Sequence, residues 1–156
     1  SGAGNMFGSL LVASVMVTVT VTIHYFGLVL LLKLLRERPR HERRSVLFSQ
    51  GTAIFFIVFC LMALHTTEIW LYAGLYHLAG ALPDLETALY FSISSFTTVG
   101  YGDIILAPHW RIIGAIESAN GLLLFGWSTA FLTTTTAQLS TLDHNWLQGA
   151  GKDRTT

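Results

Sequence analysis

The sequence predicts an all-α membrane protein with three membrane-spanning helices and a short segment that enters the membrane without crossing it. Only 12% of its 156 residues are charged and 52% are hydrophobic, whereas about 25% of a soluble domain is charged. Three long stretches carry almost no charge: 7–32, 45–67 and 108–142, the last with only Arg111 and Glu117. Each exceeds the roughly 18 to 20 apolar residues that a helix needs to cross hydrocarbon.

The first span is expected at 6–35 as an additional N-terminal helix, and no function follows from its sequence. Its apolar run is too long for a secretory signal peptide, and no basic residue precedes it. The opening SGAGN (1–5) is expected to be a cloning scar and is set aside.

A basic loop at 36–45 sets the predicted orientation. Six of the nine Lys and Arg residues lie in or beside it: Lys33, Arg36, Arg38, Arg40, Arg43 and Arg44. The positive-inside rule places this loop in the cytoplasm. The protein is expected in the plasma (inner) membrane of the cell. The N-terminus then lies outside and the short tail at 139–156 inside. The five arginines are also candidates for contact with anionic lipid.

A re-entrant segment is predicted between an outer span at 46–72 and an inner span at 109–138. Asp84 is a typical N-cap for a helix over 85–96. At 1.5 Å per residue this helix is about 18 Å long, too short to cross. The irregular chain that follows, 97–103, is tolerated at membrane depth only where protein or water surrounds it.

The segment FTTVGYGD (96–103) explains why irregular chain is placed there. Gly100 and Gly102 can take the positive φ angles that other residues avoid. If they alternate with Val99 and Tyr101, successive carbonyls can turn to one side. Unpaired carbonyls are costly in an apolar medium, but a cation can pair with them.

TTVGYGD, between a short helix and a spanning helix, closely resembles the pore module of simple bacterial potassium channels. The resemblance covers 46–138. It implies that K⁺ is bound by the carbonyls of Thr98, Val99, Gly100 and Tyr101 and by the Thr98 hydroxyl, with Gly102 completing the motif. One chain carries one filter, so the resemblance implies a homotetramer around a four-fold pore. It further implies passive potassium conduction, with no enzymatic activity, no cofactor and no nucleic-acid partner.

The resemblance also implies residues that support the filter: Thr97, Asp103, Tyr90, Phe91, Ser94, Ser95 and Glu117. Tyr90 is placed to bond Asp103, and Ser95 or a nearby backbone group to bond Tyr101. Ordinary packing is the alternative for the aromatic residues. Ser94 stands where some family members keep a buried carboxylate.

Glu117 is the only acid in the predicted inner span, and intramembrane acids are functional candidates. We consider three roles for it: support of the pore helix from behind, proton sensing, and simple packing.

The inner helix is expected to line the cavity and gate with six residues: Asn120, Gly121, Leu122, Phe125, Thr129 and Thr133. By resemblance Gly121 is the hinge. Phe125, Thr129 and Thr133 share one helical face by their spacing. Alternatively, the threonine hydroxyls bond carbonyls of their own helix, and Asn120 faces a neighbouring helix instead of the pore.

Other patterns give weaker expectations. The six histidines show no HxxxH spacing, so no metal site is predicted. An interfacial aromatic belt is expected from Trp70, Tyr72, Tyr76 and Trp110. A non-conducting modulatory subunit and a potassium-transporter subunit are alternative functions. An intramembrane enzyme is disfavoured because no Ser–His or Asp–Asp pair has suitable spacing.

Overall fold

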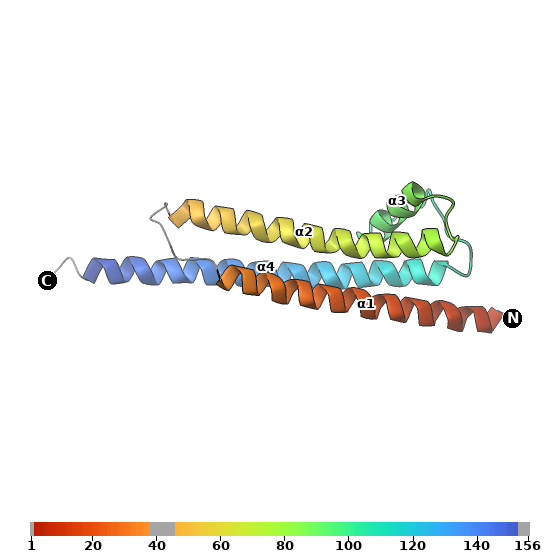
Figure 1. The fold of residues 1–156 in the computed structure, drawn as a ribbon, viewed down its shortest axis with the longest axis horizontal. Helices are drawn as coiled ribbons and strands as arrows, with labels where there is room; N and C mark the ends of the chain where they lie inside the picture. Colours follow the sequence, from red (N-terminus) through yellow and green to blue (C-terminus); the bar gives the residue numbers. More distant parts are fainter. Residues whose placement is uncertain (1, 38–45, 153–156) are drawn as a thin grey trace.

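The computed structural model describes the backbone of residues 2–37 and 46–152, and the side chains of 6–37 and 51–138. It contains four helices: α1 (Gly2–Arg36), α2 (Val46–Leu78), α3 (Leu85–Phe96) and α4 (Arg111–Lys152). Helices α1, α2 and α4 run alongside one another, and the short α3 lies at the end where α1 begins and α2 ends (Figure 1). The described part of the chain has no β-strand.

Helix boundaries match the predictions best for the short helix. The predicted 85–96 helix is α3 itself. The long helices extend past the predicted spans, since α2 reaches Leu78 and α4 reaches Lys152. Much of the predicted tail at 139–156 is therefore helical, because a helix does not have to end where hydrocarbon ends. In the basic loop, Arg38, Arg40, Arg43 and Arg44 lie outside the described residues.

Two helices in the described part of the chain are long and apolar enough to cross a membrane, over Met6–Arg36 and Gly51–Leu78. Helix α4 has the length but is more polar, with Arg111, Glu117 and the threonines at 133–136. A helix that borders a water-filled path does not need an apolar surface all round. The third span at 109–138 stays a prediction.

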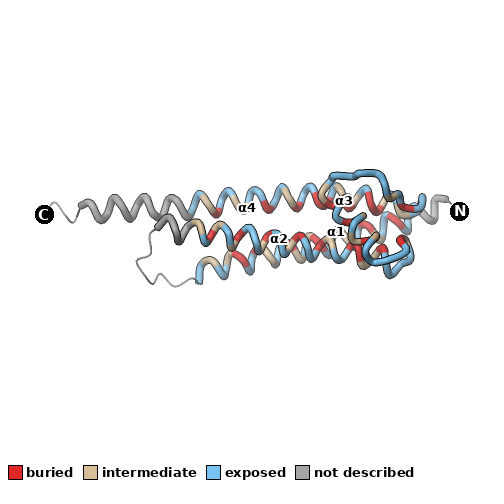
Figure 2. Tube along the Cα trace, turned by 90° about the horizontal axis from the view of Figure 1, so that it is seen from above, coloured by how far each residue is buried: buried red, intermediate tan, exposed pale blue. Residues whose placement is uncertain are grey.

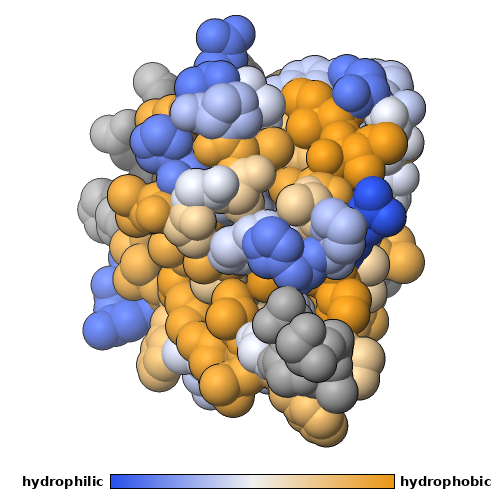
Figure 3. Space-filling model, turned by 90° about the vertical axis from the view of Figure 1, so that its right-hand side faces the viewer, coloured by the Kyte–Doolittle hydropathy of each residue, from blue (hydrophilic) through white to orange (hydrophobic). Residues whose placement is uncertain are grey.

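The helices turn their buried residues toward one another and leave the outer faces exposed (Figure 2). One core surrounds Tyr72, Tyr76 and Phe96, where α3 packs between α2 and α4. A second, smaller core joins α1 to α2 around Leu28 and Ile57. Seen from the end with α3 and the filter segment, polar residues are interspersed among apolar ones (Figure 3).

Candidate functional site

The site begins with the N-terminus of α3, which is fixed by its cap. Asp84 has an extended backbone (φ −144°, ψ 165°), and its carboxylate accepts hydrogen bonds from the backbone N–H and the hydroxyl of Thr87, both at 2.8 Å. These bonds, first the one from the backbone, lower the pKa of Asp84 below its ordinary value. A charged carboxylate also suits the positive end of the helix dipole. The cap therefore sets where α3 starts and so where it delivers the filter segment.

The filter segment has an alternating backbone. Positive φ angles occur at Thr98 (61°), Gly100 (55°) and Gly102 (76°), so every second residue is in the left-handed region. The sequence predicted this conformation for the two glycines but not for Thr98. A β-branched residue with positive φ is a genuine outlier, and such a conformation costs about 1–3 kcal/mol. The surrounding contacts must therefore hold Thr98 in place.

Those contacts come from the last turn of α3. The N–H of Thr98 donates to the Ser95 carbonyl at 2.9 Å, and the N–H of Gly100 to the Ser94 carbonyl at 3.0 Å. The N–H of Tyr101 lies 3.3 Å from Ser94 Oγ. Within the described residues, no hydrogen bond is accepted by the carbonyls of 98–101. The segment thus directs its donors to α3 and leaves a row of oxygen acceptors unused.

The end of the predicted filter segment (97–103) carries the hydrogen bond that was expected between Tyr90 and Asp103. The Tyr90 hydroxyl donates to Asp103 Oδ2 at 2.7 Å. This bond, together with the carboxylate charge, raises the pKa of Tyr90. Tyr101 itself is 73% exposed in the single chain. Phe91 instead packs inward, edge-on to Tyr76 with ring centres 5.3 Å apart.

Glu117 connects α4 to both α2 and α3. It is fully buried, and its Oε2 accepts from the Tyr76 hydroxyl at 2.6 Å. Its Oε1 lies 2.6 Å from the hydroxyl of Ser92, which is also 2.9 Å from the Ile69 carbonyl. The sequence had singled out Glu117 but neither Tyr76 nor Ser92 as its partner.

Tyr72 and Tyr76 were expected in an interfacial belt, and that expectation is wrong. Both side chains are fully buried. Their hydroxyls are used inside the chain, by Asn120 and Glu117 respectively. Buried tyrosines normally satisfy their hydroxyl in this way.

Gly121 lies directly below the end of α3. A Cβ built on this residue would be 2.0 Å from the carbonyl oxygen of Phe96. No side chain fits there, so glycine is required by the close approach of α3 to α4. The end of α3 therefore rests on the backbone of α4.

The predicted cavity residues divide into two groups. Leu122 is 62% exposed, and Thr129 and Thr133 are also exposed. Both threonine hydroxyls donate to carbonyls of their own helix, as the alternative interpretation expected. The two side chains nevertheless lie on the exposed face of α4 with Leu122. Phe125 is partly buried, with its ring centre 4.2 Å from that of His65.

Asn120 belongs to the interface with α1 and α2, not to the exposed face with Leu122. It is 3% exposed, and its Nδ2 donates to Thr20 Oγ1 at 2.7 Å and lies 3.3 Å from the Tyr72 hydroxyl. Of the two alternatives, contact with neighbouring helices is therefore the observed one, and Asn120 leaves the predicted cavity set.

The expectation that the histidines form no group of potential metal ligands also needs correction. His24 and His65 come together with Glu68 in a buried group whose ligand atoms lie within 4.8 Å of one another. The sequence offered one signal, the His65–Glu68 spacing of three residues on a helix. His24 lies 44 positions before Glu68 and could not be paired with it from the sequence.

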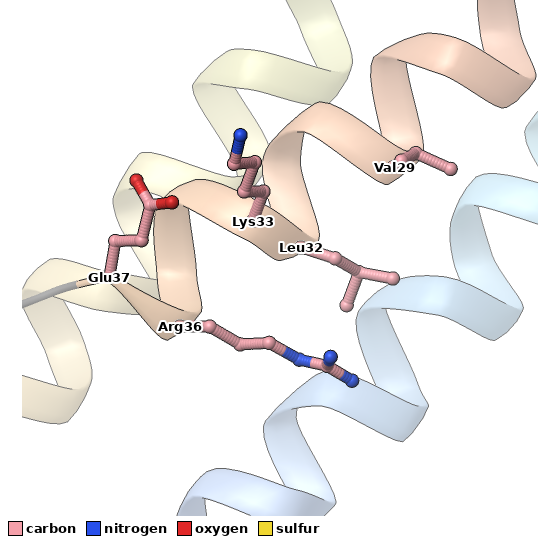
Figure 4. A pocket seen from close by; sticks show the side chains of 5 residues that line it. All are labelled: Val29, Leu32, Lys33, Arg36 and Glu37. Atoms are coloured by element: carbon pink, nitrogen blue, oxygen red, sulfur yellow. The ribbon is translucent and has the colours of Figure 1, made fainter.

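The basic end of α1 has an open groove that is lined by five residues: Val29, Leu32, Lys33, Arg36 and Glu37 (Figure 4). Arg36 and Leu32 point to one side of the helix in this view, and Lys33 and Glu37 to another. The groove combines apolar surface with two cationic side chains.

Two comparisons relate this chain to known proteins. A family described as "Ion channel" matches residues 46–138. A protein of Escherichia coli (strain K12), the "Voltage-gated potassium channel Kch", is 35% identical over 107 residues, which is 66% of this chain. The match covers only 24% of that relative. No solved structure matches the chain. The family match covers α2, α3, the segment between α3 and α4, and α4 as far as residue 138. This is more than half of the chain, and the chain therefore belongs to the ion-channel family.

Proposed function

We propose that four copies of this chain form a potassium-selective channel that conducts K⁺ passively through a filter of backbone carbonyls. The observation that carries this proposal is the alternating backbone at Thr98, Gly100 and Gly102. The N–H groups of Thr98 and Gly100 donate to α3, and the carbonyls of 98–101 have no hydrogen-bond partner in the described part of the chain. Four such segments around an axis supply stacked oxygen rings that replace the hydration shell of K⁺.

A single copy leaves the segment incomplete, which supports four-fold assembly. Val99 is 53% exposed and Tyr101 is 73% exposed, and on α4 Leu122 and Leu123 are 62% and 73% exposed. Each backbone carbonyl that lacks a hydrogen-bond partner at membrane depth costs on the order of several kcal/mol. Neighbouring copies and the ion together remove both problems, because they cover the side chains and coordinate the oxygens.

The support behind the filter favours a rigid conduction path. Helix α3 ends at Phe96, next to the filter, so the negative end of its dipole favours a cation there. Gly121 allows that end to rest on α4, and Glu117 ties α3 to α2 and α4 through Ser92 and Tyr76. Leu122, Thr129 and Thr133 are proposed to face the cavity below.

The arrangement of the helices agrees with the predicted orientation. Helix α1 begins at the end with the filter segment, and α4 runs toward the opposite end (Figure 1). Lys33 and Arg36 lie near the other end of α1, where a cytoplasmic leaflet with anionic lipid attracts basic residues. The groove beside Arg36 is the proposed lipid contact.

A flux assay in liposomes tests the proposal. The full chain is reconstituted, and uptake of K⁺ and of Na⁺ down matched gradients is measured. We expect K⁺ uptake with at least 100-fold less Na⁺ uptake. Gly102→Ala should abolish this flux because alanine is strained at a φ of 76°. Gly80→Ala is the matched control, since Gly80 has a φ of 68° outside the filter.

The outcomes separate the candidate functions. Equal uptake of both ions would reject selectivity. Absence of flux from a folded tetramer would favour the modulatory subunit, and uptake against a gradient would favour a transporter. If Gly80→Ala abolishes flux as fully as Gly102→Ala, the filter assignment loses its support.

A further inference from the structure

A buried carboxylate in α2 faces two imidazoles. Glu68 is fully buried, and its Oε1 lies 2.8 Å from His24 Nδ1 while its Oε2 lies 2.9 Å from His65 Nδ1. His24 comes from α1 and is also fully buried. Within the described residues, the ion-pair partners of Glu68 are these two rings. A buried carboxylate needs a compensating positive charge. The two neighbouring imidazoles can supply it by accepting a proton, or they can bind a metal ion together with the carboxylate.

The three ligand atoms have the chemistry and the spacing of a transition-metal site. Two imidazole nitrogens and a carboxylate are typical ligands of Zn²⁺, which binds them at about 2.0–2.2 Å. Ligand atoms of a tetrahedral site are then about 3.3 Å apart, and the three candidate ligand atoms of this group lie within 4.8 Å of one another. The two imidazoles contact different oxygens of Glu68, so the side chains must shift for one ion to bind all three residues. Glu68 supplies negative charge that offsets part of the charge of a divalent ion.

The far sides of both rings are held by one residue of α4. Ser128 Oγ lies 2.9 Å from His65 Nε2 and 3.3 Å from His24 Nε2. A metal-binding histidine usually uses its other ring nitrogen in this way, which fixes the orientation of the ring. Ser128 thus holds both Nδ1 atoms toward Glu68.

Aromatic rings pack against the group, and a groove borders it on one side. Trp127 packs on His24 with ring centres 5.3 Å apart, and Phe125 packs on His65 at 4.2 Å. An open groove of about 150 Å³ between α2 and α4 is lined by His65 and Ser128, on the side of the rings away from Glu68. A water molecule can fill the fourth position of a site with three protein ligands.

We propose that His24, His65 and Glu68 bind a divalent transition-metal ion of the Zn²⁺ class, which ties the additional helix α1 to the outer helix α2. Within the described residues no fourth His, Cys, Asp or Glu joins this group. The site is separate from the filter. The described residues form one such group, so we expect one ion per chain in any oligomeric state.

Titration with Co²⁺ alone tests the site without any flux measurement. The full chain is purified in detergent, stripped of metal and titrated while the visible absorption of bound Co²⁺ is recorded. We expect one Co²⁺ per chain with the intense bands of a tetrahedral site, and displacement by Zn²⁺. His24→Ala and Glu68→Gln should remove the bands. Ser128→Ala should weaken binding by about 10- to 100-fold, as loss of a ring-orienting partner does.

Two further variants keep the test decisive. His77→Ala removes an exposed histidine outside the group and should leave the titration unchanged. His24→Cys retains a ligand if His24→Ala does not fold, and it should shift the preference toward the softer Cd²⁺. A folded wild-type chain without tetrahedral bands overturns the proposal and leaves a purely hydrogen-bonded group. Unchanged binding in both His24→Ala and Glu68→Gln overturns it as well. Neither result bears on potassium flux.

Discussion

The filter segment and the interface of α1 with the rest of the chain satisfy their polar groups in opposite ways. In the filter segment, the carbonyls of 98–101 have no partner within the described residues, and Tyr101 is exposed. In the α1 interface, polar side chains are buried and paired across helices, as in His24–Glu68 and Thr20–Asn120. The filter segment leaves backbone oxygens without a protein partner, whereas the α1 interface pairs polar side chains of different helices with one another.

This difference predicts two kinds of mutational effect. Changes near the filter segment should alter conduction, because the proposed function depends on the geometry of the unpaired carbonyl oxygens. Changes in the α1 interface should alter the docking of α1 and the stability of the chain, and reach conduction only indirectly. The following experiments test this division, beginning with the largest expected effect.

Gly121→Ala should disrupt the packing of the C-terminal end of α3 against α4. The new Cβ would be 2.0 Å from the Phe96 carbonyl oxygen, so the end of α3 must move. We expect loss of K⁺ flux and a decrease of about 3 kcal/mol in the free energy of unfolding, the upper part of the range for overpacking. Denaturant unfolding in detergent and the flux assay measure the two effects.

Gly126→Ala is the matched control on the same helix, because nothing lies within 4 Å of its new Cβ. It should be neutral or stabilising by up to about 1 kcal/mol, since alanine has the higher helix propensity. Equal effects of both substitutions would contradict the close approach of α3 to Gly121.

Glu117→Leu should weaken the support behind the filter. It leaves the buried hydroxyl of Tyr76 without its acceptor and removes a partner from Ser92. Each unsatisfied buried group costs about 1–3 kcal/mol. The free energy of unfolding and the K⁺ flux should both fall.

Glu117→Gln separates support from proton sensing. Glutamine supplies an N–H group for Ser92 and an oxygen for Tyr76, so we expect a cost below about 1 kcal/mol. Flux through this variant is then measured across external pH. Unchanged pH dependence would discard the proton-sensing role. Destabilisation as large as in Glu117→Leu would contradict support through hydrogen bonds that glutamine can replace.

Thr20→Val should affect the α1 interface and spare conduction. It removes the oxygen that accepts from Asn120 Nδ2 at 2.7 Å. Interhelical hydrogen bonds of this kind contribute about 0.6 kcal/mol on average in membrane proteins, and we expect a loss of that size with K⁺ flux retained. Thr18→Val is the control, because the exposed Thr18 hydroxyl bonds only the Ser14 carbonyl of its own helix. Abolished flux in Thr20→Val would contradict the division between the two regions.

The smallest effect is expected at the outer rim of the filter. The hydrogen bond from Tyr90 to Asp103 raises the pKa of Tyr90, because loss of the proton would place a phenolate against a carboxylate. The bond therefore stabilises the folded chain fully below the ordinary tyrosine pKa of about 10, and its contribution is lost as pH rises through the raised value. Ultraviolet titration of the phenolate should show Tyr90 ionising earlier in Asp103→Asn, with Tyr90→Phe identifying its signal. An unchanged titration in Asp103→Asn would contradict the assignment.

Sequence reasoning succeeded where structure is determined by near neighbours along the chain. Asp84 and the length of the apolar run predicted α3, and the two glycines predicted their own positive φ angles. The same reasoning missed the positive φ of Thr98, because β-branched residues rarely adopt it. Hydrogen bonds to α3 hold Thr98 in this conformation, and the sequence does not reveal them.

Contacts between distant segments were the main source of error. Tyr76 and Glu117 are 41 positions apart, and Thr20 and Asn120 are 100 apart. An aromatic residue near the end of a span fits both an interfacial belt and a buried hydrogen bond, so Tyr72 and Tyr76 were misplaced. The helical spacing of His65 and Glu68 was visible, but the approach of His24 depends on how α1 packs.

Thr98 carries a consequence for the resting filter. Glycine at this position would relax the backbone, but it would also discard a side-chain hydroxyl that is a potential fifth oxygen ligand. The chain thus accepts about 1–3 kcal/mol of backbone strain per copy, and the proposed four-copy ring would contain this strain four times. The hydrogen bond from the Thr98 N–H to the Ser95 carbonyl opposes relaxation of this residue, so loss of that bond should allow a negative φ at residue 98 and reorient the neighbouring carbonyls.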